Sequence, residues 1–289
     1  MDLTRQRDTA ADIGRLQGFV ACHSRLTVLT GAGVSTESGI PDYRDASGAW
    51  KSAPPMQHQQ FMTSHAARQR YWARALVGFR TLHGARPGAA HRALARLEAS
   101  GIVQGLITQN VDGLHQKAGS RRVIDLHGRA EQVRCMGCGA LRMRHDLHTE
   151  LAERNPRWRE MKASVRPDGD ADLETDFSDF DVPGCGRCGR GIWKPDVVFF
   201  GDSVPRERVA RARALVDAAE ALLVVGSSLM VYSGYRFVRQ AVEAGKPVAC
   251  LNLGRTRADP LYALKLEAPV GDTLTALADA VSGGERVTS

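Results

Sequence analysis

Short apolar runs alternate along this chain with stretches whose apolar residues recur at helical spacing. The runs that predict strands begin just after Arg25 and recur at residues 102–108, 123–126, 197–200, 221–225 and 248–251. The helical patterns cover residues 91–99, 205–219, 232–244 and 272–281, and we expect the last to end at Gly283. Strands that alternate with helices predict an α/β fold built on a doubly wound, mainly parallel sheet.

Two stretches interrupt this alternation. Residues 41–87 contain two tryptophans and several prolines, and we expect a loop and helices inserted after the first strand. Residues 128–194 contain four cysteines in two CxxC pairs. Between the pairs, residues 168–181 carry seven carboxylates and no basic residue, which predicts an exposed, mobile acidic loop.

Composition narrows the class of protein. The chain has 289 residues, of which 43% are hydrophobic and 25% charged, as in ordinary globular proteins. No apolar run approaches the roughly 18 residues that a membrane-spanning helix requires, so we expect no membrane partner. Asp2, Asp8 and Asp12 argue against a secretory signal or a transit peptide. With the Ala- and Arg-rich composition, they favour a bacterial, cytoplasmic protein.

The net charge of +7 comes mainly from arginine. No run of five like charges occurs, so we interpret the excess as a solvated Arg-rich surface. A zinc-ribbon protein that binds nucleic acid is the alternative. It is disfavoured because the segment between the cysteine pairs is acidic and its aromatic residues are not interleaved with basic ones.

The two CxxC pairs predict a metal site. Cys135 and Cys138 form the first pair, Cys185 and Cys188 the second, and residues 139–184 separate them. Two such pairs can supply a tetrahedral thiolate site for one zinc ion. Four thiolates leave no open coordination position, so we expect a structural zinc, with a redox-active CxxC motif as the alternative. Glycines suited to the tight turns flank the thiols at Gly137, Gly139, Gly186 and Gly189.

A glycine-rich turn follows the first predicted strand. Gly31, Ala32 and Gly33 would let backbone N–H groups approach a phosphate, and we expect the Ser/Thr/Glu stretch after them to begin a helix. The third glycine of a GxGxxG motif is absent, because position 36 is Thr. A plain tight turn is therefore the alternative.

Polar residues also follow other predicted strands, where a parallel sheet binds its ligands. The segment 108–115 (TQNVDGLH) follows one strand and His127 follows another. An imidazole with a pKa near 6.5 suits a general base, although a single histidine can equally be structural. Small or polar residues end two later strands, at 226–228 (GSS) and 252–254 (NLG), and suit a ribose or phosphate.

Taken together, these residues resemble the sirtuin family over about residues 25–277. The resemblance is carried by GAGVSTESGIPDYRD, TQNVDGLH, His127-Gly128, the two cysteine pairs, KPDVVFFGD and VVGSSLMVYSG, in that family's order. Their spelling is similar to that of the class II branch, which includes a mitochondrial member in animals.

The resemblance implies how the chain is divided. A Rossmann-like NAD-binding domain would comprise residues 1–40, 88–127 and 195–289. Residues 41–87 would form a cofactor loop and helical insert, and residues 128–194 a small zinc-binding module with the acidic loop. The active site would lie between the large domain and the two smaller parts.

The resemblance also implies the role of each site residue. Catalytic residues would be His127, the base, with Asn110 and Asp112. NAD would be bound by Gly31, Ala32, Gly33, Thr36, Asp42, Tyr43, Arg44, Gln109, Asn110, Asp112, Gly226, Ser227, Ser228, Asn252, Gly254 and Val270. Substrate would be bound by Val197, Val198, Phe199, Phe200 and Gly201, pairing with the peptide as an added strand. Tyr43 stands where most relatives have Phe.

The implied activity is NAD-dependent removal of acyl groups from protein lysines. The acyl oxygen attacks the ribose carbon that nicotinamide leaves, and His127 takes a proton from a ribose hydroxyl. The products would be free lysine, nicotinamide and O-acyl-ADP-ribose. Protein ADP-ribosylation and lipoamidase activity use the same NAD site and stay open as alternatives, and so does an NAD sensor without turnover.

The preferred acyl group is less defined. Tyr71 and Arg74 resemble a Tyr/Arg pair in relatives that act on succinyl- and malonyl-lysine. There the two side chains bind the carboxylate of the acyl group, with which an arginine could form two parallel hydrogen bonds. The alternative, which we favour, is a helix face on which Tyr71 packs inward and Arg74 is solvated.

Overall fold

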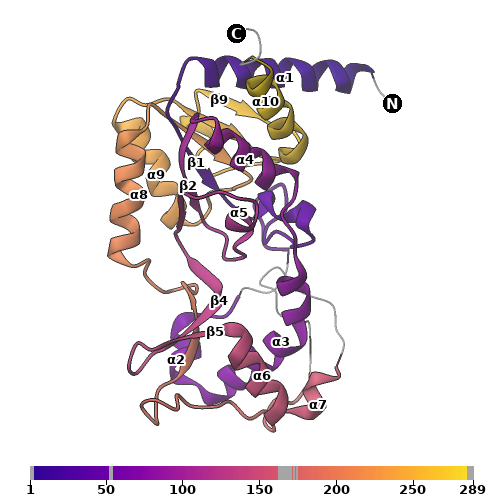
Figure 1. The fold of residues 1–289 in the computed structure, drawn as a ribbon, viewed down its shortest axis with the longest axis vertical. Coiled ribbons are helices and arrows are strands. Elements are labelled where there is room, and N and C mark those ends of the chain that lie inside the picture. The colour runs from indigo at the N-terminus through magenta and orange to yellow at the C-terminus, as the bar shows by residue number, and fades with distance from the viewer. Residues whose placement is uncertain (1–2, 52–54, 162–170, 172, 174, 285–289) are drawn as a thin grey trace.

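The computed structural model describes residues 3–51, 55–161, 171, 173 and 175–284. Figure 1 shows a larger part built on a six-stranded sheet and, beyond it along the long axis, a smaller part containing α2, α3, α6 and α7. Strand β4 (Gly128–Cys135) runs from one part into the other. None of the helices in the described ranges is both long and apolar enough to span a membrane.

The larger sheet is entirely parallel, with strand order β3-β2-β1-β7-β8-β9. This order, with the inserted strands left out, is that of a Rossmann fold, whose ligand crevice lies where the strand order reverses. Here that point is the carboxyl end of β1 and β7. The strands are β1 (Leu26–Thr30), β2 (Val103–Thr108), β3 (Val123–Asp125), β7 (Ala221–Val225), β8 (Val248–Leu251) and β9 (Leu264–Leu266).

Helices cover both faces of this sheet, because its strands alternate their side chains between two apolar cores. Val28 faces a core with α1, α4 and α10, whereas the adjacent Leu29 faces a core with α8 and α9. The first group is α1 (Leu3–Ala21), α4 (Ala89–Ala99) and α10 (Val270–Gly284), and the second is α8 (Arg206–Ala218) and α9 (Tyr232–Glu243). The short α5 (Leu114–Lys117) follows β2.

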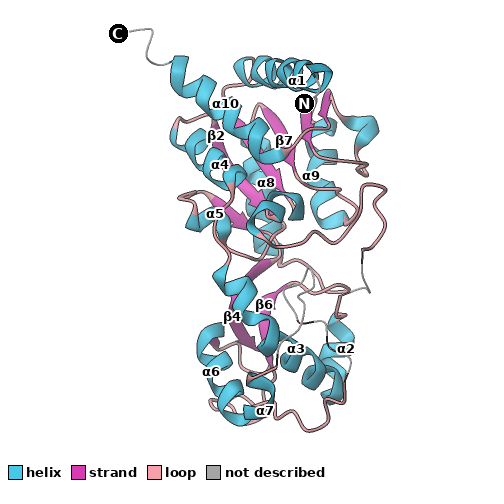
Figure 2. Cartoon of the chain, turned by 90° about the vertical axis from the view of Figure 1, so that its right-hand side faces the viewer, coloured by secondary structure: helices cyan, strands magenta, loops and turns pink. Residues whose placement is uncertain are grey.

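The smaller part has a core of its own, formed largely by aromatic side chains. Phe61, Trp72, Trp158 and Phe180 are each at most 1% exposed and belong to one cluster. The elements around it are α2 (His58–Thr63), α3 (His65–Gly84), α6 (Arg144–Arg154), α7 (Pro156–Arg159) and an antiparallel sheet of order β5-β4-β6, with β5 at Leu141–Met143 and β6 at Trp193–Val197. Figure 2 shows these helices clustered beside β4 and β6.

The sequence patterns located most elements and misplaced one. The strand expected at residues 197–200 lies earlier, at Trp193–Val197, because Cys135 in β4 pairs with Trp193 in β6. Past Val197 the chain forms only an isolated bridge between Phe200 and Gln57. Apolar runs had not indicated α1, β4, β5 or β9.

The acidic stretch 168–181 falls partly outside the described residues, at 168–170, 172 and 174. Its described end is packed rather than free. Phe177 stacks on Trp158, with ring centroids 5.4 Å apart, and Phe180 is 1% exposed. Asp179 and Asp181 pair with arginines of α7 and α6. The expected exposure is confirmed at Asp179 and Asp181, whereas Phe177 and Phe180 anchor this end against Trp158.

Candidate functional site

A cavity of about 430 Å³ opens at the carboxyl ends of β1, β2, β7 and β8. This is the switch point of the parallel sheet, where an α/β fold binds its ligands, and the volume suits a small molecule or cofactor. The structure brings most of the predicted site residues together there. The lining includes Gly31, Ala32, Gly33, Asp42, Tyr43, Arg44, Gln109, Asn110, Asp112, His127, Val197, Val198, Phe200, Gly226, Ser227, Ser228 and Asn252.

Two glycine loops meet at the floor of this cavity. The Gly33 N–H donates to the Gly226 carbonyl at 2.9 Å, and the Gly31 N–H donates to Val225 at 3.2 Å. A Cβ on Gly31 would lie 2.7 Å from the Ser227 Cβ, and one on Gly226 would lie 2.7 Å from the Val34 nitrogen. Only glycines permit this approach, which leaves exposed backbone facing the cavity.

The helix expected after the glycine turn is not formed. Two short 3₁₀ segments, Ala32–Val34 and Thr36–Ser38, follow β1 instead. Gly39 ends the second in the left-handed region, with φ of 80°. Thr36 turns away from the cavity and donates its hydroxyl to the Gly33 carbonyl at 3.1 Å. A dipole from a regular helix is therefore absent at this turn, and backbone N–H groups are what it can offer a phosphate.

A buried polar network supports the wall of the cavity below Asn110. The Ser35 hydroxyl donates to Asp112 at 2.7 Å and accepts from the Asn110 amide at 3.0 Å. Next to it, the imidazoles of His91 and His115 lie 4.8 Å apart and are at most 1% exposed. Sequence reasoning assigned no individual role to Ser35, His91 or His115. Ser35 lies in the glycine-rich turn and His115 ends the segment TQNVDGLH, both of which the sequence had singled out, whereas His91 carried no signal.

Burial keeps these two histidines neutral. Desolvation lowers the pKa of His115 to about 3, with a smaller effect from His91. Desolvation likewise lowers the pKa of His91 to about 4, although the nearby Asp112 carboxylate opposes this. The Asp112 carboxylate therefore accepts its hydrogen bonds from uncharged donors, which are the Ser35 hydroxyl and, at 2.9 Å, the Leu114 N–H.

His127 follows β3 and is held at both ring nitrogens. Nδ1 lies 2.9 Å from the Gln109 carbonyl oxygen, and Nε2 lies 2.8 Å from the Ser233 hydroxyl. Because a carbonyl only accepts, Nδ1 carries the proton and Nε2 is the basic nitrogen. Desolvation is the main cause that lowers the pKa of His127 to about 4, and the charges of Arg208 and Arg236 add to it. The imidazole is thus a neutral, oriented base at pH 7.

A loop at residues 42–51 covers one side of the cavity. The Arg44 guanidinium lies 4.0 Å from the centroid of the Trp50 ring and donates to the Gly48 carbonyl at 2.7 Å. Tyr43 packs edge-on against the same ring. Asp42 forms an ion pair with Lys51. Trp50 and Lys51 also line the cavity, and sequence reasoning had not placed them there.

Three predicted NAD-binding residues do not line the cavity. Thr36 is one. Gly254 packs instead against Ala46, whose carbonyl oxygen would lie 2.6 Å from a Cβ at that position. Val270 lies in the apolar core at the start of α10. Asn252 does line the cavity, and its amide donates to the Leu253 and Gly254 carbonyls.

The segment after β6 connects His127 to the smaller part. The Val198 N–H donates to the His127 carbonyl at 2.8 Å, and the Phe200 carbonyl accepts from the His58 N–H at 2.8 Å. Phe199 packs against Phe61 and Tyr71. Val198, Phe199, Phe200 and Gly201 line a second cavity that shares His127 with the first.

Tyr71 and Arg74 lie apart from both cavities, in α3. Tyr71 packs inward among Phe61, Trp72 and Phe199, as the packing alternative expected. Arg74 is half-buried rather than solvated, and its Nε donates to the Ala171 carbonyl at 2.7 Å. Neither side chain lines either of these two cavities.

The four cysteines converge in the smaller part. Their sulfur atoms all lie within 4.8 Å of one another, with Cys135 and Cys188 at 3.7 Å and Cys138 and Cys185 at 3.9 Å. Zinc–sulfur bonds of about 2.3 Å give a tetrahedron with edges of about 3.8 Å, so the four sulfurs fit one zinc ion. The remaining space is closed, because a Cβ on Gly191 would lie 2.1 Å from the Cys135 sulfur. Sequence reasoning missed Gly191.

Comparison with known proteins agrees with this geometry. The model of the Sir2 family matches residues 31–233. A Bordetella bronchiseptica protein described as an NAD-dependent protein deacetylase is 58% identical over 265 residues, covering 91% of this chain and 96% of its own length. A Bradyrhizobium diazoefficiens protein described as NAD-dependent protein deacetylase 2 is 59% identical over 253 residues, covering 87% of this chain and 92% of its own length.

Solved structures give the same result. A complex described as Sir2 with a p53 peptide and NAD⁺ superposes with a TM-score of 0.73 at 30% identity, covering 95% of this chain and 98% of that one. A second, from work on the mechanism and regulation of Sir2 enzymes, gives a TM-score of 0.74 at 31% identity, covering 94% and 98%. The fold, the glycine loops, the oriented histidine and the cysteine cluster thus meet in one assignment: this chain belongs to the Sir2 family.

Proposed function

We propose that this protein is an NAD-dependent lysine deacylase that removes acetyl or related acyl groups from proteins. One observation supports this most directly. His127, neutral and with Nε2 as its basic nitrogen, stands at the junction of the cofactor-sized cavity and a second cavity. The relatives described as NAD-dependent protein deacetylases agree with this activity. The products are free lysine, nicotinamide and O-acyl-ADP-ribose, and one water molecule is consumed as the lysine amine is released, so the acyl group passes from lysine to ADP-ribose.

NAD is the co-substrate, and it supplies the ribose carbon that accepts the acyl oxygen as nicotinamide leaves. We infer that the backbone at Ala32 and Gly33 binds its phosphates. Ser227, Ser228 and Asn252, at the ends of β7 and β8, bind the adenosine half. Asp42, Tyr43 and Arg44 close over it. Gly31 and Gly226 act indirectly, by allowing the two loops to approach, and the same indirect role fits Thr36, Gly254 and Val270.

Asn110 and Asp112 position the nicotinamide end. Asn110 lines the cavity while its amide is fixed by donation to the Gly31 carbonyl and to Ser35, both at 3.0 Å. Asp112 is fixed by Ser35. A side chain already oriented by such bonds reorganises little when a ligand binds. We infer that Gln109 contributes chiefly through its backbone carbonyl, which orients His127.

We infer that His127 accepts the proton of a ribose hydroxyl. Nε2 carries the lone pair, and it must exchange the Ser233 hydroxyl for the sugar hydroxyl when substrates bind. A base whose pKa is about 4 holds a proton weakly, so it acts as an acceptor within an already polarised transition state rather than as a strong base. General-base catalysis of this kind typically contributes about 10²–10⁴-fold.

The acylated lysine enters along residues 197–201. The Val197 backbone already pairs with Gly128, and Val198 and Phe200 each have one backbone group bonded. A substrate strand would therefore use the remaining backbone groups of Val198, Phe199 and Gly201. Because Arg74 is bonded to Ala171, we infer that acetyl is favoured over succinyl, and that Tyr71 and Arg74 act by packing the insert.

The proposed division of the chain follows from these roles. Residues 1–40, 88–127 and 195–289 bind NAD, residues 41–87 supply the cofactor loop and helical insert, and residues 128–194 hold zinc. With four thiolate ligands the zinc has no open position, so we infer that it is structural. Reduced cysteines in CxxC pairs suit a reducing compartment, which supports a cytoplasmic location.

The test is mass spectrometry of acyl-lysine peptides incubated with the protein and NAD. Acetyl, succinyl and long-chain acyl peptides are compared, and free nicotinamide is quantified in each. We expect NAD-dependent loss of acetyl with one nicotinamide released per lysine. Nicotinamide release with ADP-ribosylated protein and no acyl loss would replace deacylation by ADP-ribosyl transfer. No nicotinamide with any peptide would overturn both and leave an NAD-binding sensor.

A further inference from the structure

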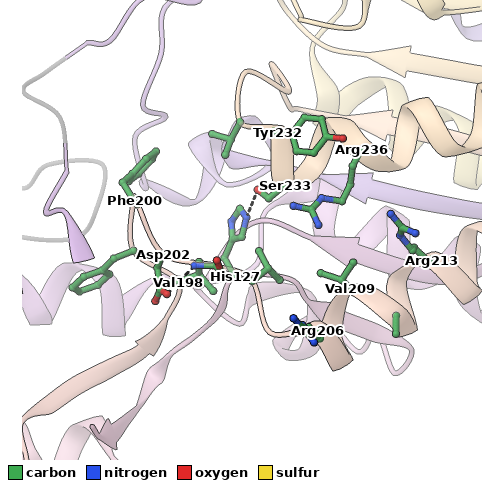
Figure 3. A pocket seen from close by; sticks show the side chains of 16 residues that line it. His127, Val198, Phe200, Asp202, Arg206, Val209, Arg213, Tyr232, Ser233 and Arg236 are labelled. Atoms are coloured by element: carbon green, nitrogen blue, oxygen red, sulfur yellow. Dashed lines mark hydrogen bonds between the residues drawn. The ribbon is translucent and has the colours of Figure 1, made fainter. Parts of the chain in front are cut away.

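A second cavity, of about 700 Å³, lies on the other side of His127 from the cofactor-sized cavity and shares His127, Val198, Phe200 and Val231 with it. One wall is the segment after β6, and the other is formed by α8 and the start of α9. In Figure 3, His127 lies between Phe200 and Asp202 on one side and three arginines on the other. None of the arginines lines the cofactor-sized cavity, and of the three only Arg236 bears on the site above, through the effect of its charge on the pKa of His127.

The three arginines converge from two helices. Arg206 and Arg213 line the cavity from α8, with Val209 and Ala210 between them at helical spacing, and Arg236 lines it from α9. Among the described residues, none of their guanidinium groups forms an ion pair. The one acidic residue in the lining, Asp202, already lies 3.2 Å from Nδ1 of His58 and 3.8 Å from the ammonium group of Lys194.

Arg236 has the strongest need for a partner. Its Nε is buried and donates to no group among the described residues. The guanidinium is held over the Tyr232 ring, 5.3 Å from the centroid, which fixes it without using its hydrogen-bond donors. A buried donor without an acceptor destabilises a structure, and a carboxylate can satisfy a guanidinium in bidentate fashion. The cavity therefore offers a site for an anionic group beside the reacting centre.

The spacing of the charges suits an extended peptide. Arg206 and Arg213 are seven residues apart, which at 1.5 Å per residue separates them by about 10.5 Å along α8. In extended chain the side chains at positions i and i+2 share one face and lie about 7 Å apart, a separation that two long arginine side chains can meet. Acidic side chains at two positions of one substrate segment can thus face the arginines together.

We propose that this cavity, the arginine groove, binds the residues flanking the acylated lysine and selects substrates with aspartate or glutamate there. The inference rests on the proposed deacylase function and adds a substrate class to it. The groove acts on recognition, because the arginines contact the flanking peptide rather than the acyl group. Its main effects are on peptide affinity and on kcat/KM.

The test uses three acetyl-lysine peptides that differ only in flanking residues: two aspartates, two glutamines or two arginines, placed on either side of the lysine. Peptide binding is measured by fluorescence anisotropy and turnover by nicotinamide release at saturating NAD. We expect kcat/KM for the aspartate peptide to exceed that for the glutamine peptide on the order of tenfold, as two charge pairs can provide. The ratio should fall as salt rises, because salt screens such pairs.

Variants locate the effect. Arg213→Glu should abolish the preference and favour the arginine peptide. Arg211→Glu makes the same charge change at an exposed position of the same helix that does not line the cavity, and it should leave the ratio unchanged. Equal kcat/KM for the three peptides in the wild-type protein, or an equal loss in both variants, would overturn the inference. Tighter binding of the aspartate peptide without any turnover would uphold the groove while refuting the deacylase function.

Discussion

The imidazole Nε2 of His127 lies 2.8 Å from the hydroxyl of Ser233, which stands 106 residues later in the chain. Ser233 belongs to the first turn of α9, on the far side of the site from the strand that precedes His127. The hydroxyl donates to the basic nitrogen and occupies the position that a ribose hydroxyl takes in the proposed mechanism. Catalysis therefore requires this hydrogen bond to open, and the two side chains should differ in what their loss does.

Replacing His127 by Ala should lower kcat about 10²–10⁴-fold while NAD still binds, because the base is removed and the glycine loops remain. Ser233→Ala should cost less than about tenfold, since Ser233 only occupies the base until substrates arrive. Nicotinamide release and NAD binding by calorimetry check both variants. Equal losses of kcat in the two variants would mean that Ser233 takes part in the chemistry.

Stability should fall as the solution is acidified from pH 7 to pH 5. Burial lowers the pKa values of His91 and His127 to about 4 and that of His115 to about 3, while the unfolded chain binds protons near pH 6.5. Within that window the unfolded state binds more protons, so acid favours unfolding by up to about 1.4 kcal/mol per pH unit for each group.

Urea unfolding at pH 7, 6 and 5 measures this slope. In the variant His127→Ala the free energy of unfolding should change less steeply with pH, by up to the slope that corresponds to one bound proton. A matched control is His65→Gln, at the exposed start of α3, which should keep the wild-type slope. A free energy of unfolding that is constant from pH 7 to pH 5 would contradict the neutral, buried state of the three histidines.

A methyl group on Gly31 should weaken NAD binding through steric conflict with Ser227, whose Cβ would be 2.7 Å away. Overpacking of this kind typically costs about 1–3 kcal/mol. The double variant Gly31→Ala with Ser227→Gly removes the two contacts with the Ser227 side chain and leaves the Gly226 carbonyl oxygen at 2.9 Å from the new Cβ. It also removes the 2.6 Å hydrogen bond from the Gln109 amide. We expect its melting temperature to lie above that of Gly31→Ala alone. Additive losses would show that the loops do not press on each other.

Gly191→Ala should release the zinc. The added Cβ would lie 2.1 Å from the Cys135 sulfur and 2.8 Å from that of Cys188, so the four thiolates could not keep their positions. Elemental analysis should find about one zinc per chain in the wild-type protein and much less in this variant, with a lower melting temperature. Gly186→Ala, beside the same cysteines but facing open space, is the control that should retain zinc. Equal zinc content in both would refute the cluster geometry.

Local pattern determined much of this protein by itself. The parallel strands β1, β2, β3, β7 and β8 and the helices α4, α8, α9 and α10 follow from apolar periodicity, because a buried parallel strand and an amphipathic helix leave different repeats in sequence. The CxxC pairs indicated zinc, because thiolate ligands must be paired at short spacing to surround one ion. His127 and the residues at the ends of β1, β2, β7 and β8 were identified because parallel strands end at one edge of a sheet.

Only the tertiary structure decided the rest. The strand expected at 197–200 moved to Trp193–Val197 because its pairing with β4 fixes the register, and pairing between distant strands leaves no local repeat. Ser233 and Ser35 escaped notice because their partners, His127 and Asp112, lie 106 and 77 residues away in sequence. Gly191 escaped notice because the Cys135 sulfur that it approaches belongs to the other cysteine pair, across the long insert. The arginine groove exists because α8 and α9 place arginines that are 23 or more residues apart in sequence around one cavity. In the sequence, arginines at helical spacing predict a solvated helix face equally well.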